Sequence, residues 1–177
     1  MTPVSEYARF ELMHKVKEAR MKPSLIEALQ NITTGIYILT TGKGHETHGM
    51  IVSWVSQISF DPPLIMVAIR KNRPTHAMIT RNKNFALSIL KKEQKDLVGQ
   101  FKLADTRNRF KGLKCVVAKT GVHIIGEALA YIDCELYQTI DVDDHTLFIG
   151  RMVDGDVLNK GYPLSVQEYG KIYLGYA

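Results

Sequence analysis

Residues 49–76 constrain the fold of this chain more than any other stretch. Two apolar, β-branched runs flank a pair of prolines, and the second run ends abruptly in positive charge. The runs are 50–59 and 64–69, the prolines are Pro62 and Pro63, and the cations are Arg70, Lys71 and Arg73. Such runs, separated by a proline turn, predict two neighbouring β-strands.

The order of these residues suits a ligand with a flat apolar head and an anionic tail. Backbone amides and the hydroxyls of Ser53, Ser56 and Ser59 could meet the polar edge of a ring. Arg and Lys at the end of the next strand could hold a phosphate, Arg by a two-pronged fork and Lys as a point charge. Strand residues of these types are more often core residues, however, and the serines could simply be solvated. Pattern alone leaves both interpretations open.

The rest of the chain predicts many short strands and few helices. Further strands are expected over residues 35–41, 85–90, 122–125, 128–140 and 146–153, with turns at 141–144 and 154–156. The almost wholly apolar run 64–69 is expected to be a strand that is buried on both faces. Helices are expected over 24–31, over 75–80 with Thr75 as cap, and over 92–102, and 103–114 is expected to be a basic surface loop. An N-terminal helical arm is expected within residues 1–22. Without regular βαβ alternation, these elements favour a closed antiparallel barrel over a Rossmann fold.

Composition indicates one soluble domain, residues 1–177. Hydrophobic residues make up 45% of the chain and charged residues 23%, as in ordinary globular proteins. The net charge of +5 is scattered, without a basic helix or an aromatic RNA-binding signature, so no nucleic-acid partner is expected. No apolar run approaches the roughly 20 residues that span a bilayer, so we expect no membrane segment and a cytoplasmic location.

Cysteine and histidine patterns exclude two further site classes. Cys115 and Cys134 are too few and too loosely spaced for a disulfide framework, and we expect two buried or half-buried thiols. The segment from His45 to His48 is not a metalloprotease motif, because its histidines are three residues apart and glycines surround it. No metal site is expected.

Three segments of this sequence resemble a known family. They are Gly49-Met50 followed by Ser53-Trp54-Val55-Ser56-Gln57-Ile58-Ser59 and Asp61-Pro62-Pro63-Leu64, then Asp144-His145-Thr146-Leu147-Phe148-Ile149-Gly150, and the strand before it, Glu127–Cys134. Together they resemble the signature of the flavin reductase-like, FMN-binding split-barrel family, from about residue 24 to the C-terminus. Asp143 departs from the pattern, since glycine is common at this position.

The resemblance implies a mainly β fold, an antiparallel Greek-key split β-barrel with a few flanking helices, that forms a homodimer with FMN at or near the subunit interface. It implies that Met50, Ile51, Val52 and Ser53 line the flavin ring through backbone contacts and that Ser59 lies near the ribityl chain or phosphate. It places Arg70, Lys71, Thr75 and His76 at the phosphate end. Trp54 could stack on the ring or pack inside the barrel or the dimer.

The implied activity is that of an FMN-dependent oxidoreductase. Hydride from NADH or NADPH would pass through the flavin to free flavin, a ferric complex or an electron-acceptor protein, and no catalytic base is needed. His145 is the candidate catalytic residue, since an imidazole beside the flavin could favour the reduced anion, although the turn at 143–144 could equally hold this side chain. The alternatives are a flavoredoxin-like electron carrier without nicotinamide activity and a basic ligand- or nucleic-acid-binding barrel.

Overall fold

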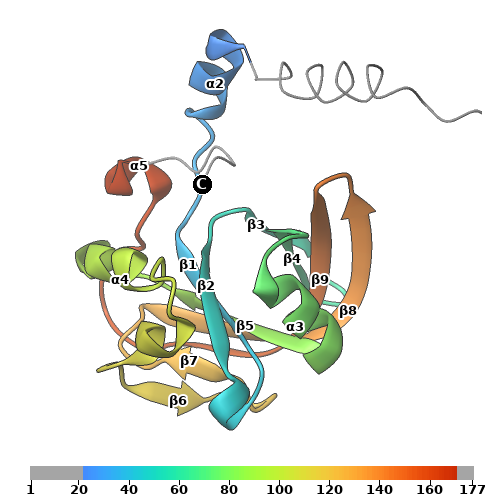
Figure 1. Cartoon of the computed structure of the whole chain (residues 1–177), viewed down its shortest axis with the longest axis vertical. Helices are drawn as coiled ribbons and strands as arrows, with labels where there is room; N and C mark the ends of the chain where they lie inside the picture. Colours follow the sequence, from blue (N-terminus) through green and yellow to red (C-terminus); the bar gives the residue numbers. More distant parts are fainter. Residues whose placement is uncertain (1–21, 171–177) are drawn as a thin grey trace, which may run out of the picture. The chain divides into compact units, whose positions relative to one another are not determined.

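The computed structural model describes residues 22–170, and Figure 1 shows the course of the chain. Contacts divide the chain into a small unit that extends to Thr33 and a larger one that begins at Thr34. The small unit contains one described helix, α2 (Pro23–Leu29). The expected N-terminal arm lies outside the described residues except for Lys22, and the single domain over 1–177 stays a prediction.

The larger unit is mainly β. Its strands are β1 (Tyr37–Thr41), β2 (His48–Val52), β3 (Val55–Ser59), β4 (Leu64–Arg70), β5 (Asn84–Ile89), β6 (Cys115–Val117), β7 (His123–Ile125), β8 (Ala130–Val142) and β9 (His145–Val157). Its helices are α3 (Pro74–Asn82), α4 (Lys95–Gln100) and α5 (Val166–Tyr169), with 3-10 turns η1 (Gly44–Glu46), η2 (Lys92–Gln94) and η3 (Thr106–Phe110). No described helix has the length and apolar character needed to cross a membrane.

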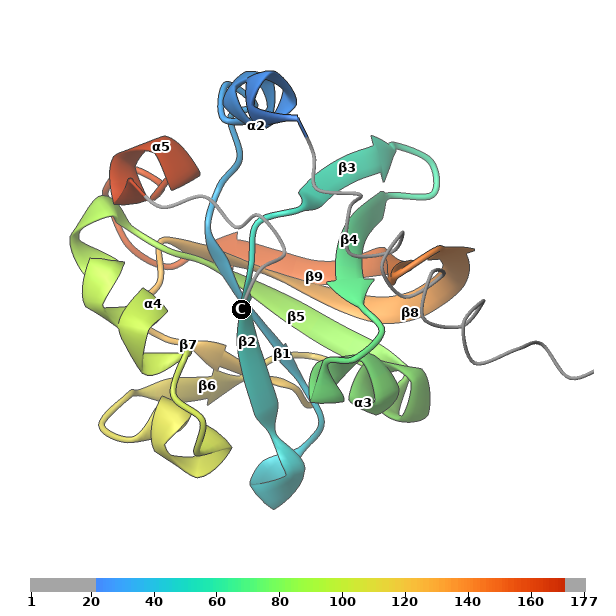
Figure 2. The same cartoon turned by 45° about the horizontal axis from the view of Figure 1, so that its top comes forward.

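Seven strands form one antiparallel sheet in the order β2-β1-β5-β8-β9-β4-β3, and β6 pairs with β7 in a second sheet. The two end strands, β2 and β3, are joined by only Ser53 and Trp54. The sheet must therefore curl until its ends meet, without a β2–β3 ladder, and Figure 2 shows this arrangement. The expected split antiparallel barrel is confirmed.

The barrel interior is filled from all sides of the curled sheet. Leu39, Val67, Phe85, Leu87 and Phe148 are fully buried in one cluster. Because side chains alternate along a strand, this cluster takes every second residue and leaves the others on the outer face. Burial along β4 alternates accordingly, and the expectation that residues 64–69 are buried on both faces is wrong.

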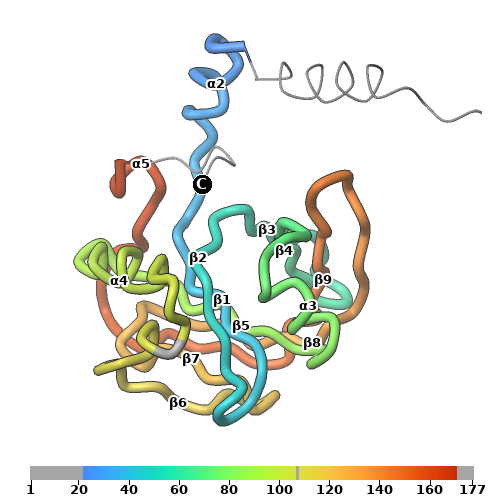
Figure 3. The backbone as a smooth tube through the Cα atoms, viewed as in Figure 1, coloured from blue at the N-terminus to red at the C-terminus, as the bar shows by residue number. Residues whose placement is uncertain are grey.

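Other local predictions also need correction. The strand expected over 50–59 is divided, because the chain crosses between the two ends of the sheet at Ser53 and Trp54. The turn expected at 154–156 is absent, since β9 continues to Val157 opposite Ala130 in the long hairpin traced in Figure 3. Instead of one helix over 92–102, the structure has the 3-10 turn η2 followed by the shorter helix α4. The expected loop over 103–114 contains the 3-10 turn η3, and β6 was not predicted.

The hairpin between β8 and β9 turns where the family pattern has glycine. Asp143 adopts a φ of 44°, in the left-handed region that glycine usually occupies. Aspartate is among the few other residues that tolerate this conformation, because its short polar side chain can hydrogen-bond locally. The turn thus forms despite the substitution.

Candidate functional site

One edge of the barrel, along β2, has no further strand beside it among the described residues. β2 ends the strand order, and the Gly49 carbonyl accepts a hydrogen bond from Arg109 Nη1 at 2.8 Å instead of from a strand. Because N–H and C=O groups alternate in direction along a strand, Ile51 faces the same free edge. Met50 and Val52 direct their side chains toward the core and their backbone groups toward β1. The free edge thus belongs to Gly49 and Ile51 and ends at Ser53.

Helix α3 begins beside this edge. Arg73 is its N-cap residue and Pro74 opens the helix, so the prediction of Thr75 as cap is wrong. Thr75 is buried instead, and its hydroxyl shares a 3.0 Å hydrogen bond with Nδ1 of His48 on β2. This bond fixes the start of α3 against β2, where the positive end of the helix dipole favours an anion.

His48 is a buried imidazole with an incomplete set of hydrogen bonds. The residue is 8% exposed, and its Nε2 has no partner among the described residues. Burial lowers the pKa of His48, and the nearby charge of Arg109 lowers this pKa further. The imidazole is therefore neutral near pH 7.

Arg109 brings a cation to the same place from η3. Besides Gly49, its guanidinium binds the Leu103 carbonyl through Nε at 3.0 Å and Nη2 at 2.8 Å. Burial lowers the pKa of Arg109, and the second cause is the like charge of Arg73. Two guanidinium groups thus share the region at the start of α3. The sequence prediction missed Arg109, and the only local signal was the basic character of the 103–114 segment.

The other predicted phosphate residues contact the β8–β9 turn. Arg70 Nε lies 3.6 Å from Asp144 Oδ2, and Lys71 Nζ lies 3.7 Å from Asp141 Oδ2. His76 Nε2 is 2.8 Å from Thr146 Oγ1. These contacts connect the β4–α3 segment to the hairpin.

Ser59 lies apart from these residues. It pairs with Leu64, where β4 begins, whereas Arg70 ends the same strand. Seven residues of strand extend over about 20 Å, so Ser59 and the start of α3 lie at opposite ends of β4. The structure therefore does not bring Ser59 together with Thr75.

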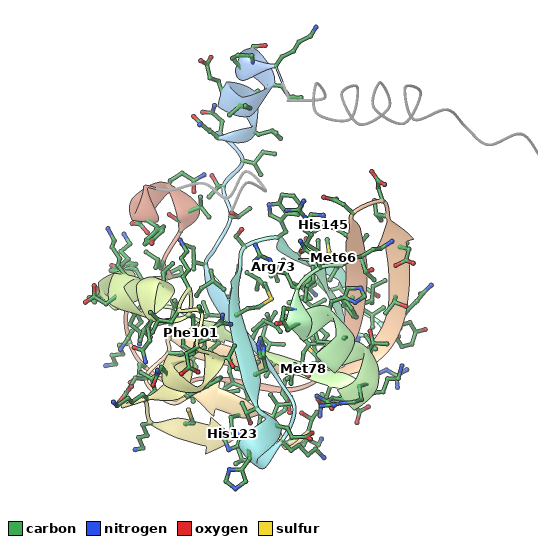
Figure 4. All side chains as sticks on the ribbon, viewed as in Figure 1. Met66, Arg73, Met78, Phe101, His123 and His145 are labelled. Atoms are coloured by element: carbon green, nitrogen blue, oxygen red, sulfur yellow. The ribbon has the colours of Figure 1, made fainter. Side chains whose placement is uncertain are left out.

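His145 and Trp54 form a ring pair across the outer face. Their ring centroids are 5.0 Å apart, and His145 Nδ1 lies 2.6 Å from Asp144 Oδ1. The hydrogen bond to His145 is the main cause that lowers the pKa of Asp144, which is thus ionised and accepts the Nδ1 proton. In Figure 4, His145 and Arg73 lie at the same end of the barrel, and His123 lies at the opposite end.

An open cavity and two cysteines are further features of the larger unit. An open cavity of about 410 Å³ is lined by residues of η1, η3, β6 and their neighbours: Gly44, His45, Thr47, Thr106, Phe110, Cys115 and His123. Burial raises the pKa of both cysteine thiols, which are unpaired as expected. Among residues 22–170, no cluster of three metal-ligating side chains occurs.

Comparison with known proteins gives a consistent family. The family described as flavin reductase like domain matches residues 29–171. The high molecular weight rubredoxin of Moorella thermoacetica is 35% identical over 84% of this chain and 67% of its own length. The ferric-chelate reductase (NAD(P)H) of Archaeoglobus fulgidus is 30% identical over 81% of this chain and 88% of its own.

Solved structures agree with this assignment. The flavin reductase of styrene monooxygenase from Pseudomonas putida S12 aligns with a TM-score of 0.69 and 30% identity, over 80% of this chain and 90% of that one. Several relatives are much longer, since this chain spans about a quarter of the diflavin flavoproteins it matches, such as diflavin flavoprotein A 1 of Synechocystis. The matched residues include β2, α3 and the Asp144–His145 turn described above. The chain therefore belongs to the flavin reductase-like domain family.

Proposed function

We propose that this protein binds FMN and passes electrons from NADH or NADPH through the flavin to an acceptor. The observation that carries the proposal is the free edge of β2 beside two guanidinium groups at the start of α3. A flavin nucleotide combines a ring with hydrogen-bonding edges and an anionic phosphate, and these two features suit the two parts of the site. The match to the ferric-chelate reductase (NAD(P)H) supports the nicotinamide co-substrate.

The protein would bind and orient the flavin, which supplies the hydride chemistry when bound. Ile51 and Ser53 would present backbone groups to the ring, while Met50 and Val52 shape the strand from the core side. Thr75 would hold the start of α3 in place through its bond to His48.

The predicted residues at the phosphate end would act mainly by fixing the segment between β4 and α3. Arg70, Lys71 and His76 contact the hairpin, so their positive charge or position would support an anion without direct contact. Ser59 stays a proposed ribityl contact only if a second subunit brings it to the flavin, because within one chain it lies at the far end of β4.

His145 and Trp54 would form the wall where a nicotinamide arrives. Asp144 holds Nδ1 of His145, which leaves Nε2 as the atom that would meet the co-substrate or the flavin. Trp54 holds the other side of the imidazole by ring contact. We propose that His145 stabilises negative charge on the flavin and does not act as a base in the hydride step.

A flavin titration and a turnover assay test this function together. We expect purified protein to bind FMN, measured by quenching of flavin fluorescence, and to oxidise NADH or NADPH, measured by absorbance, when FMN is present. Protein that neither binds FMN nor oxidises either nucleotide would contradict the proposal. Parallel titration with FAD decides whether FMN is preferred.

A flavoredoxin-like carrier is the second candidate function. The relatives named as a high molecular weight rubredoxin and as diflavin flavoproteins support it, because the matched segment is only about a quarter of a diflavin flavoprotein. A carrier would retain FMN but oxidise NADH and NADPH negligibly until a separate reductase is added. The same turnover assay, run with and without an added reductase, distinguishes the two functions.

We also propose that the protein is a homodimer through the outer face of β3, β4, β9 and β8. Cross-strand partners share a face, so Trp54, Ala68, Leu147 and Ile140 form one row over this face. Trp54 and Ile140 are exposed, as is Val142 at the end of the hairpin. Contiguous exposed apolar residues are typical of protein interfaces.

Mass measurement by light scattering tests the dimer. We expect wild-type protein to have the mass of two chains and Ile140→Asp to shift toward one chain, because a charge would be buried in the interface. Val117→Asp is the matched control, since Val117 is an exposed apolar residue on β6 outside this face. A monomeric wild type, or equal effects of both substitutions, would contradict the proposed dimer.

We also propose a cytoplasmic location, which the two unpaired thiols support.

A further inference from the structure

Among the described residues, the hydrogen-bond acceptors of the Arg109 side chain carry no negative charge. Its guanidinium donates to two main-chain carbonyls, at Leu103 and Gly49, and both are neutral. The charge that acts on it most is Arg73, which has the same sign. Burying a guanidinium near a like charge is costly unless an anion joins the pair.

The surroundings of Arg109 are prepared for such an anion. Helix α3 starts at Pro74 with its N-cap Arg73, so the dipole adds positive potential. His48 beside it is neutral and buried, with Nε2 unpartnered among the described residues. A guanidinium group cannot in practice be deprotonated in a protein, so anion binding here would not depend on a histidine proton.

The position of η3 does not depend on the guanidinium alone. Gln100 Nε2 donates to the carbonyls of Arg109 and Lys111, both at 3.0 Å. The rings of Phe101 and Phe110 contact each other edge to face, with centroids 5.2 Å apart. These contacts fix the backbone at Arg109, so its side chain can be changed while the segment keeps its place.

We propose that Arg109 makes this site select phosphorylated flavins over riboflavin. This inference rests on the proposed function, since it assigns a residue to the phosphate of the flavin bound at the β2 edge. Nε and Nη2 of Arg109 already donate to Leu103, and Nη1 donates to Gly49 at the strand edge. The second N–H of Nη1 and that of Nη2 would hold phosphate oxygens together with Arg73. The sequence prediction placed Arg70, Lys71, Thr75 and His76 at the phosphate end. Of these, Arg70 and Lys71 pair with Asp144 and Asp141.

The test compares FMN and riboflavin on the full-length protein by fluorescence titration. We expect Arg109→Gln to weaken FMN binding by roughly 10- to 100-fold and to leave riboflavin affinity within about twofold. Riboflavin serves as the internal control for folding, because it keeps the ring and lacks the phosphate. Arg81→Gln, on the same helix as Arg73 but paired with Glu46 on the surface, should change neither affinity.

Each outcome is decisive. If Arg109→Gln weakens the binding of FMN and riboflavin equally, the role of Arg109 is purely structural. If the FMN affinity is unchanged, the phosphate lies elsewhere. Either result overturns the inference and leaves the proposed function intact. Wild-type protein that binds neither flavin would remove the proposed function itself. If Arg109→Gln does not fold, Arg109→Lys replaces it as the test, because lysine keeps the charge and lacks the planar guanidinium. We expect Arg109→Lys to lower the ratio of FMN affinity to riboflavin affinity by a smaller factor. An unchanged ratio would overturn the inference.

Discussion

Replacement of Thr146 by valine tests the network that joins α3 to the β8–β9 hairpin. Thr146 is 2% exposed, and its hydroxyl donates to Asp141 Oδ1 at 2.7 Å. Because the hydroxyl has one proton, His76 Nε2, at 2.8 Å, must donate to the same oxygen. Valine keeps the shape and removes both hydrogen bonds.

The expected cost comes mainly from His76. The Asp141 carboxylate is exposed and regains water, but the half-buried imidazole N–H loses its partner. Leaving such a donor unsatisfied costs about 1–3 kcal/mol, so we expect Thr146→Val to lower the free energy of unfolding by that amount. The same substitution removes the hydrogen bond between α3 and the hairpin, and His145 lies directly before Thr146 on this hairpin.

Urea denaturation followed by tryptophan fluorescence measures this cost. Trp54 is the single tryptophan and contacts His145, so its emission reports on this part of the barrel. Thr139→Val, at an exposed position of β8, is the matched control and should change stability by less than about 0.5 kcal/mol.

A double-mutant cycle with His76→Ala isolates the bond. We expect a coupling energy of at least about 1 kcal/mol between the two substitutions, because they remove the same interaction. A coupling below about 0.5 kcal/mol, or a Thr146→Val cost equal to that of the control, would refute the reasoning.

Three further predictions concern other parts of the barrel. Gly49→Ala would place Cβ 2.7 Å from the Phe101 ring and should lower the free energy of unfolding by about 1–3 kcal/mol in urea denaturation. Gly99→Ala, with nothing within 4 Å of the added Cβ, is the control and should be neutral or stabilising. Equal effects of the two substitutions would contradict this steric argument. Folding lowers the pKa of His48 from 6.5, so as the pH falls the unfolded chain is protonated at this residue before the folded protein is, and stability should fall below about pH 6.5. His48→Gln should flatten this part of the curve of stability against pH. An unchanged curve would assign the pH dependence to other groups. Asp143→Gly should stabilise by about 0.5–1 kcal/mol in the same assay because its φ is 44°, and a loss of stability would show that the aspartate side chain contributes more than the backbone strain costs.

Local sequence determined most of the β elements and the family. Alternating β-branched runs bounded by Gly, Pro and Asp specify strands through short-range preferences, which is why β1, β4 and β5 lie within a few residues of their predicted positions. The motif around Asp144 and His145 was identified by its resemblance to the family, and in the structure Nδ1 of His145 lies 2.6 Å from Asp144 Oδ1. These features depend on neighbours in the chain, so a single sequence contains the information.

Tertiary structure decided which residues share the site. Arg109 contacts Gly49 across 60 positions of sequence, and Arg70 and Lys71 pair with hairpin carboxylates that are 74 and 70 positions away. The division of residues 50–59 into two strands likewise follows from closure of the sheet, since the break lies where the chain passes between its two ends. Such contacts arise from how a curled sheet brings distant strands together, and no local pattern of residue types encodes that pairing.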